Sequence, residues 1–393
     1  MSGTTTIAIG RNMTVFAKKE STPGTVVIPA AGDMIVVNSA ELQIPSPQFE
    51  DDKSVRASRS AFGRFNTRTP GGAFKLQHYV RPSGTAGTAP EADAVFESAF
   101  GTKTVVPVTS VAYTPAAIQT AFSLYVKKDH TVYVASGCVV DKFGIKKDNK
   151  GMLEASEDGK SFNVIWTGTG ALGEAIVTTP VAGTEEWFTV DDVKKWCTGS
   201  HILIDTEQIL ITGTYWEATA GGSAGKIKMK RGHNSTAPAA HLISAAITPW
   251  LPTGTETGVP LAARVGTMTL DAVTVPFLDI DYNVENGITL NEDEVTGTAT
   301  PTDFFEGERK VTGGLNLFFR KTDLKWFADA IKQVRKAMII NFGSVAGKLV
   351  AISNPYCEFD MPNVSGDKEV MKVGTKYTAY ASAGNDETSL TFT

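Results

Sequence analysis

The residues best suited to chemistry in this sequence are the acids of an alternating segment near position 280. Asp279, Asp281 and Glu285 occupy alternate positions, and the oxygen ligands of a calcium-binding loop begin in the same way. Such a loop needs Gly at its sixth position and Glu at its twelfth, where this sequence has Val284 and Leu290. The pattern therefore predicts a strand with one acidic face and no calcium site.

Other patterns match known sites by letter only. Gly168, Gly170 and Gly173 have the spacing of a dinucleotide-binding loop, but the next residues run into Thr-Thr-Pro and cannot form the long helix that holds a pyrophosphate. No two histidines are four residues apart, as a helical metal site requires, and no Gly-x-Ser-x-Gly motif occurs. The sequence therefore predicts no catalytic residues, no cofactor, no metal and no enzyme.

Composition indicates a folded chain with a hydrophobic core and argues against a protein that wraps nucleic acid. The chain has 393 residues, of which 42% are hydrophobic and 20% charged, as expected for a core-forming chain of roughly two or three domains. A net charge of −5 argues against a protein that wraps nucleic acid. Cys138, Cys197 and Cys357 are far apart, which predicts free thiols in a reducing compartment. Neither a signal peptide nor an apolar run of about 20 residues is expected.

The elements that must position these residues are mostly strands. We expect strands at 73–80, 122–126, 131–135, 138–145 and 161–166, and again at 313–319, 337–342 and 348–352. Each set is interrupted by a helix, at 90–101 and at 322–334. Apolar stripes on these helices are expected to pack on a sheet; their residues are Val95, Phe96, Phe100, Leu324, Phe327 and Ile331.

The repeated order suggests four regions. We expect an N-terminal arm at 1–35, a first α+β domain at 36–170, a small β-rich inserted domain at 171–260 and a second α+β domain at 261–393. The arm either orders against a neighbouring subunit or stays a disordered tail. The two α+β domains are either an internal duplication or two ordinary units with common elements.

Several segments resemble the tail tube (major tail) proteins of long, non-contractile-tailed bacteriophages. In the first domain these are Ser-Arg-Ser-Ala-Phe-Gly-Arg-Phe at 58–65, Thr-Pro-Gly-Gly-Ala-Phe at 69–74, Tyr-Val-Arg-Pro-Ser-Gly-Thr-Ala-Gly at 79–87, Pro-Glu-Ala-Asp at 90–93 and Phe-Gly at 100–101. In the second they are Gly-Glu-Arg-Lys-Val-Thr-Gly-Gly-Leu-Asn-Leu-Phe-Phe at 307–319 and the segment at 380–392. The resemblance implies a mainly β (α+β) fold, a β-sandwich or half-barrel with one helix packed on its outside.

The resemblance also implies a function. It implies rings that stack into a virion tail tube, assembled in the host cytoplasm, through which duplex DNA is ejected without specific binding. Partners would be further copies of the chain and other tail proteins, such as the tape measure and terminator proteins, and not a membrane. With a duplicated domain, three chains could form a ring of pseudo-sixfold symmetry; true hexamers are the alternative. Asp279, Asp281 and Glu285 are the candidate lumen-facing acids.

Two other functions fit a β-rich chain of this composition. One is a binding or adhesin-like module whose inserted domain recognises a receptor, and the other is a head-decoration protein. Both would differ from a tube protein in assembly, because neither needs to form stacked rings.

Overall fold

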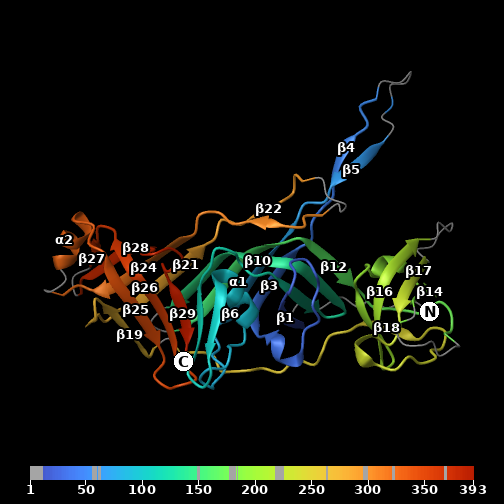
Figure 1. Ribbon diagram of the computed structural model, residues 1–393, viewed down its shortest axis with the longest axis horizontal. Coiled ribbons are helices and arrows are strands. Elements are labelled where there is room, and N and C mark those ends of the chain that lie inside the picture. Colours follow the sequence, from blue (N-terminus) through green and yellow to red (C-terminus); the bar gives the residue numbers. More distant parts are fainter. Residues whose placement is uncertain are drawn as a thin grey trace.

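Antiparallel strands make up most of the protein (Figure 1). The computed structural model describes residues 12–54, 60, 63–147, 151–176, 183, 185–216, 225–262, 264–294, 300–320, 324–366 and 370–393. Every strand pairing within these residues is antiparallel. The mainly β class expected from the sequence is thus confirmed. Neither α-helix in the described ranges is long and apolar enough to cross a membrane.

One long sheet runs through both halves of the body. Its strands, in spatial order, are β3 (Val37–Gln43), β6 (Gly72–Tyr79), β11 (Glu154–Ser161), β10 (Thr131–Lys147), β21 (Asp279–Glu285), β24 (Lys310–Phe318) and β28 (Lys372–Tyr380). Two strands, β26 (Val350–Phe359) and β27 (Asn363–Ser365), pair with the other side of β28. The pairing of β10 with β21 joins the two halves edge to edge. We call this pairing the seam.

Each half continues in a set of shorter strands. These are β1 (Met13–Lys19), β2 (Met34–Ile35), β9 (Phe122–Lys128) and β12 (Asn163–Thr167) in the first half, and β19 (Gly266–Leu270), β20 (Val273–Thr274), β25 (Lys336–Phe342) and β29 (Ser389–Phe392) in the second. The pairings repeat: β1 with β2 and β9, β9 with β10, and β10 with β12 correspond to β19 with β20 and β25, β25 with β26, and β26 with β29.

In each half a hairpin follows the first strand of the long sheet, β3 in the first half and β21 in the second. In the first half it is β4 (Gln48–Asp51) with β5 (Arg64–Arg68), and in the second β22 (Thr289–Leu290) with β23 (Phe304–Phe305). The two hairpins differ in position: β22 lies along the body, over the first half, whereas β4–β5 projects away from it (Figure 1). The side chains of β4 are all exposed.

Helix α1 (Asp93–Phe100) lies at the centre of the core. Val95, Phe96 and Phe100 are buried, and Phe96 stacks on Phe392 of the second half with ring centroids 5.5 Å apart. The hairpin of β7 (Gly101–Val106) and β8 (Ser110–Pro115) also contacts the helix, and β8 pairs with β29. The expected packed helix is thus present as α1, and the elements around it leave residues 94–100 all buried.

Helix α2 (Lys325–Ile331) is shorter than the helix expected at 322–334, and it buries a different face. Trp326 is its buried residue and packs edge-on against Phe359 at 5.3 Å, while Phe327 is half-buried. Leu324 and Ile331, expected in the buried stripe, are 64% and 71% exposed. A helix of two turns offers little surface to the sheet; the bulky indole takes the buried position, and Leu324 and Ile331 face away. The expected cap at 322–323 lies outside the described residues.

A separate six-stranded sheet lies at the end of the body near β12 (Figure 1). Its strands in order are β13 (Gly170–Ala171), β18 (Ala246–Pro249), β15 (His201–Ile204), β16 (Glu207–Trp216), β17 (Gly225–Lys230) and β14 (Glu185–Val190). It has a hydrophobic core of its own, built from alternating residues such as Ile202, Ile204, Ile209 and Ile211. The tandem strands expected at 199–213 correspond to β15 and β16.

Two further expectations need correction. Residues 12–35 are not an extended arm: β1 pairs along its whole length with β9, and Val15 and Phe16 are buried in the body. The strands expected at 131–135 and 138–145 are one strand, β10, because a bulge between Ala135 and Cys138 bends the chain without ending it. Its first part pairs with β9 and its second part with β11.

Candidate functional site: the polar face of the long sheet

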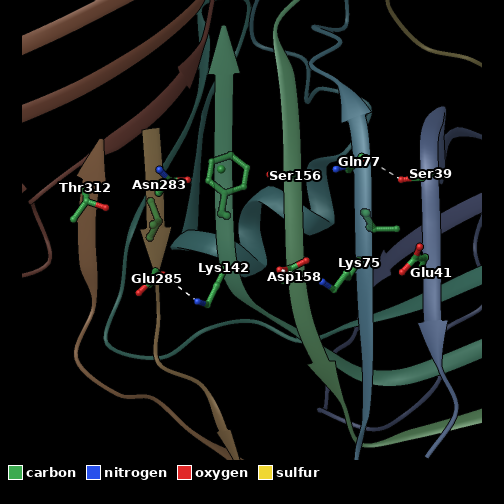
Figure 2. A pocket seen from close by; sticks show the side chains of 14 residues that line it. Ser39, Glu41, Lys75, Gln77, Lys142, Ser156, Asp158, Asn283, Glu285 and Thr312 are labelled. Carbon is green, nitrogen blue, oxygen red and sulfur yellow. Dashed lines mark hydrogen bonds and ion pairs between the residues drawn. The ribbon is translucent and has the colours of Figure 1, made fainter. Parts of the chain in front are cut away.

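The long sheet has one apolar and one polar face, because polar and apolar residues alternate along each strand. On β6, Phe74, Leu76 and His78 point into the core, and Lys75 and Gln77 point the other way. The residues exposed on the second side form what we call the polar face: Ser39, Glu41, Lys75, Gln77, Lys142, Lys146, Ser156, Asp158, Asp279, Asp281, Asn283, Glu285, Thr312, Gly314, Asn316 and Lys376. Figure 2 shows the part of this face that crosses the seam, with α1 behind the sheet.

Opposite charges pair across strands on this face. Lys142 Nζ is 3.1 Å from Glu285 Oε1 across the seam, and Lys75 Nζ is 3.9 Å from Asp158 Oδ2 within the first half (Figure 2). The hydrogen bond to Glu285, together with its charge, raises the pKa of Lys142. Both pairs are exposed, so they contribute little to stability but keep the local charge balanced.

Amides and hydroxyls fill the space between the charges. Asn316 Nδ2 donates to Asp279 Oδ1 at 2.5 Å in the second half, and Ser39 Oγ donates to Gln77 Oε1 at 3.1 Å in the first. Asn283 also donates to Asp281 at 3.1 Å. The side chains of the face thus form hydrogen bonds to one another along the surface.

The polar face is hollowed on both sides of the seam. One hollow of about 570 Å³ is lined from β3 to β24, and a second of about 630 Å³ lies over β10, β21, β24 and β28. Their lining includes Lys142 and Glu285 in the first and Lys146 and Asp281 in the second. Both hollows are lined mainly by polar residues, whereas small-molecule pockets are mostly apolar, so the face suits contact with another surface better than the capture of a small molecule.

The three acids singled out from the sequence lie together on this face. Asp279 is half-exposed and Asp281 and Glu285 are exposed, all on the side of β21 opposite the buried Ile280. Sequence reasoning missed the lysines that share the face with them, such as Lys146, which lies opposite Asp281 in the pairing of β10 with β21. The exposed alternate positions of β10 and β28 could have indicated these lysines. The acids and lysines leave the face close to neutral.

A buried ion pair supports the sheet beneath this face. His78 Nε2 is 3.1 Å from Glu157 Oε1, and its other ring nitrogen lies 3.0 Å from the Tyr79 carbonyl oxygen. Burial alone would lower the pKa of His78, but the Glu157 carboxylate and these hydrogen bonds outweigh it and the pKa is raised. His78 and Glu157 lie on neighbouring strands, β6 and β11, so the pair helps fix their register.

The second sheet contains another buried polar cluster. Glu207 accepts hydrogen bonds from Arg231 Nε and Nη2 at 2.7 and 2.6 Å, and lies 2.9 Å from His241 Nε2. Asp205 approaches the other ring nitrogen of His241 at 2.7 Å. Burial opposes the charged form of Glu207, but Arg231 and backbone donors lower its pKa to about 2. These partners satisfy Glu207 from all sides, so the cluster is structural.

Among the described residues, no group of three or more His, Cys, Asp or Glu side chains is placed to hold a metal ion. The candidate site is the polar face, a surface formed by the two halves of the long sheet, and its charged side chains are paired across strands.

Comparison with known proteins finds a similarity over part of the chain. Residues 211–393 match the family described as phage tail tube protein. The matched region contains the whole second half of the long sheet and the last strands of the second sheet, and the family is structural and not enzymatic. Among curated proteins, none matches the chain.

Proposed function

We propose that the whole chain is a phage tail tube protein, whose copies close into rings that stack into the tail of the virion. The observation that carries this proposal is the seam. Within the chain, the edge strand of the second half, β21, pairs with the end of β10 in the first half. Within the described residues, β3 pairs only with β6, and β27 pairs only with β28, so the corresponding edges are left without a partner. Open sheet edges favour pairing with another copy.

An internal duplication supports this use of the edges. In both halves a bulge of the same size interrupts the ladder, between Ala135 and Cys138 and between Asn354 and Cys357, and a cysteine follows it each time. The strand order of the long sheet and of the shorter strands also repeats. A chance similarity of two α+β units would not place the same bulge at the same point. Duplication therefore supports two equivalent tube domains in one chain.

Two tube domains per chain favour rings of three copies with pseudo-sixfold symmetry. Each copy would pair its β3 with the β26–β27 edge of the next, and three such contacts would alternate with three seams. The resulting barrel has about 24 strands and a backbone diameter of about 50 Å, from a spacing of ~4.8 Å and a tilt of ~40°. That diameter leaves a wide channel once side chains are added.

The polar face then lines the channel. Asp279, Asp281 and Glu285 would face the lumen with the lysines beside them. A strongly basic lining would hold DNA phosphates by counterion release, and a lining of paired charges does not. Such a surface suits a conduit through which DNA passes without specific binding. The tube would be assembled in the host cytoplasm and would meet other tail proteins, such as the tape measure and terminator proteins, at its inside and end.

The second sheet is, in this proposal, a domain inserted at about 171–260 between the two tube domains. It lies at one end of the body, and none of its described strands belongs to the long sheet. We therefore place it on the outside of the ring.

Negative-stain electron microscopy of the purified protein tests the proposal. Stacked rings with a central hole are the expected result. Monomers that bind cells would favour an adhesin-like module, and attachment to capsids without ring formation would favour a head-decoration protein; either result would contradict the proposal.

A further inference from the structure

The second-half hairpin packs on the first half within one chain. Phe304 of β23 is buried against Phe162, with ring centroids 6.1 Å apart, in a cluster with Val139 and Leu290. Around this contact, Ile288 N donates to Asp141 Oδ1 at 2.7 Å. The hairpin is thus held by both apolar and polar contacts, and its partner is the half that lies across the seam.

The first-half hairpin has an equivalent residue in the same register. Phe65 lies opposite Glu50 in the pairing of β4 with β5, as Phe304 lies opposite Leu290 in that of β22 with β23. Phe65 precedes the first residue of β6 by the same number of positions as Phe304 precedes Val311 of β24. The two phenylalanines are therefore equivalent by sequence spacing and by strand register.

The receiving position also has an equivalent. Phe162 directly follows Ser161, which pairs with Gly72 of β6, and Tyr380 directly follows Ala379, which pairs with Val311 of β24. Tyr380 thus stands in the second half where Phe162 stands in the first. An aromatic ring occupies both positions.

The two members of the first pair are buried, and the two members of the second are not. Phe304 and Phe162 are 7% and 2% exposed, whereas Phe65 and Tyr380 are 55% and 41% exposed. Tyr356, which lies opposite Tyr380 in the pairing of β26 with β28, is 39% exposed as well. Within one copy, Phe65 and Tyr380 therefore lack the ring contact that Phe304 and Phe162 make with each other.

We propose that the β4–β5 hairpin of one copy packs across the second half of the next copy, with Phe65 against Tyr380 of that copy. The proposal rests on the ring proposed above, because only a neighbouring copy brings an equivalent of the seam to β26 and β27. The β4–β5 hairpin is the expected partner of this surface because it matches the β22–β23 hairpin. It has the same strand register, the same position in its half of the protein and a phenylalanine at the same place. The β4–β5 hairpin that projects from the body in Figure 1 would then connect neighbouring copies in the ring.

The face of the hairpin provides a matched control. Phe49 is on the same hairpin and 50% exposed, but it neighbours the Glu50–Phe65 pair along the strand and so points to the opposite side. The Arg64 guanidinium lies 4.4 Å from the centre of its ring. Phe49 therefore has similar chemistry and exposure and is expected to make no contact with Tyr380 of the next copy.

Cysteine cross-linking tests the proposal in the full chain. All variants carry Cys197→Ser, since that thiol is half-exposed, whereas Cys138 and Cys357 are buried. In assembled protein treated with a short bifunctional thiol reagent, which spans the space that two contacting rings would fill, Phe65→Cys with Tyr380→Cys is expected to give covalent dimers and trimers. Phe49→Cys with Tyr380→Cys is expected to give far fewer, because Phe49 points to the opposite side of the hairpin.

A second measurement covers the case in which the cysteine pair disturbs assembly. Phe65→Ala is expected to raise the protein concentration needed for half-assembly by about tenfold, as removal of a central aromatic contact does, and Phe49→Ala is not. Rings in which the Phe65 pair links no better than the Phe49 pair, or in which both alanine variants assemble alike, would overturn this inference and leave the ring proposal intact. Absence of rings from the unaltered protein would overturn the ring proposal itself.

Discussion

Lys142 of β10 and Glu285 of β21 form an ion pair, 3.1 Å long, across the seam that joins the two halves of the protein. The two residues lie far apart in the sequence, and each is exposed on the polar face. Six residues of β10, from Lys142 to Lys147, face six of β21 along this line. The seam is therefore a sheet-edge contact between the two halves of the long sheet, made within a single chain.

The charges at the seam should act as a pair. Reversing one of them, as Lys142→Glu or Glu285→Lys, places like charges opposite each other and is expected to lower the thermal unfolding temperature. The double exchange is expected to recover most of the loss, and 1 M salt should shrink all three differences because the pair is exposed. Strictly additive effects of the two changes in low salt would show that the charges do not interact.

Two glycines in the long sheet are expected to differ in tolerance. A Cβ at Gly159 would lie 2.2 Å from the Phe74 ring and 2.4 Å from the Val139 carbonyl oxygen, so Gly159→Ala should destabilise by about 1–3 kcal/mol. A Cβ at Gly374 would meet only the Asn316 side chain, at 2.9 Å, which can move. Gly374→Ala is the matched control and should be near neutral. Chemical denaturation measures both; equal losses would show that the packing of Phe74 is not the cause.

The two ends of α2 test which face of that helix is buried. Trp326→Ala removes a buried indole from its contact with Phe359 and is expected to cost about 3–5 kcal/mol. Ile331→Ala changes an exposed side chain and is expected to stay within about 0.5 kcal/mol. Urea unfolding of both variants as unassembled protein compares them. A larger loss for Ile331→Ala would mean that the helix packs by the stripe expected from the sequence.

Alternation explains why the strands could be predicted and the helix face could not. On β6 the burial of Phe74, Leu76 and His78 follows directly from a period of two, which any half-buried strand obeys. On α2 an equally clear apolar pattern failed at Leu324 and Ile331, because a short helix touches the sheet at one point. Periodicity shows which residues share a side, and only tertiary contacts decide how much of that side is covered.

The second sheet should lose stability in acid because of Glu207. Its pKa is lowered from 4.5 to about 2 in the folded protein, so its contribution is fully present above pH 4.5 and is lost as the pH falls from 4.5 toward 2. The change amounts to up to about 3 kcal/mol. Glu207→Gln should be less stable at neutral pH, because it leaves Arg231 buried without a counter-charge, and should show a flatter pH dependence in this range.

An exposed glutamate on another strand of the same sheet supplies the control. Glu186→Gln changes the same kind of side chain on β14 without touching the Glu207 cluster. Denaturation curves at several pH values between 2 and 7 give the pH dependence of the free energy of unfolding. Glu186→Gln should keep the pH dependence of the unaltered protein, and Glu207→Gln should not. An unchanged slope in Glu207→Gln would assign the acid sensitivity to another group.

The sequence predicted the acidic residues of the candidate site but not the lysines beside them. The alternation of Asp279, Asp281 and Glu285 predicts a charged strand face, and the structure has these acids on one side of β21. The sequence could not show that Lys142 lies beside Glu285, because the pairing of β10 with β21 joins residues that are far apart in the chain. Local patterns therefore gave the acids, while the neutral balance of the face depends on long-range strand pairing.

The rotational symmetry of the assembled ring tests the central claim most directly. An electron cryo-microscopy reconstruction of purified tubes should show three copies per ring, six similar sheets around the channel, and β3 of each copy paired with the β26–β27 edge of the next. Six copies per ring, or a protein that remains a monomer at every concentration, would contradict the account.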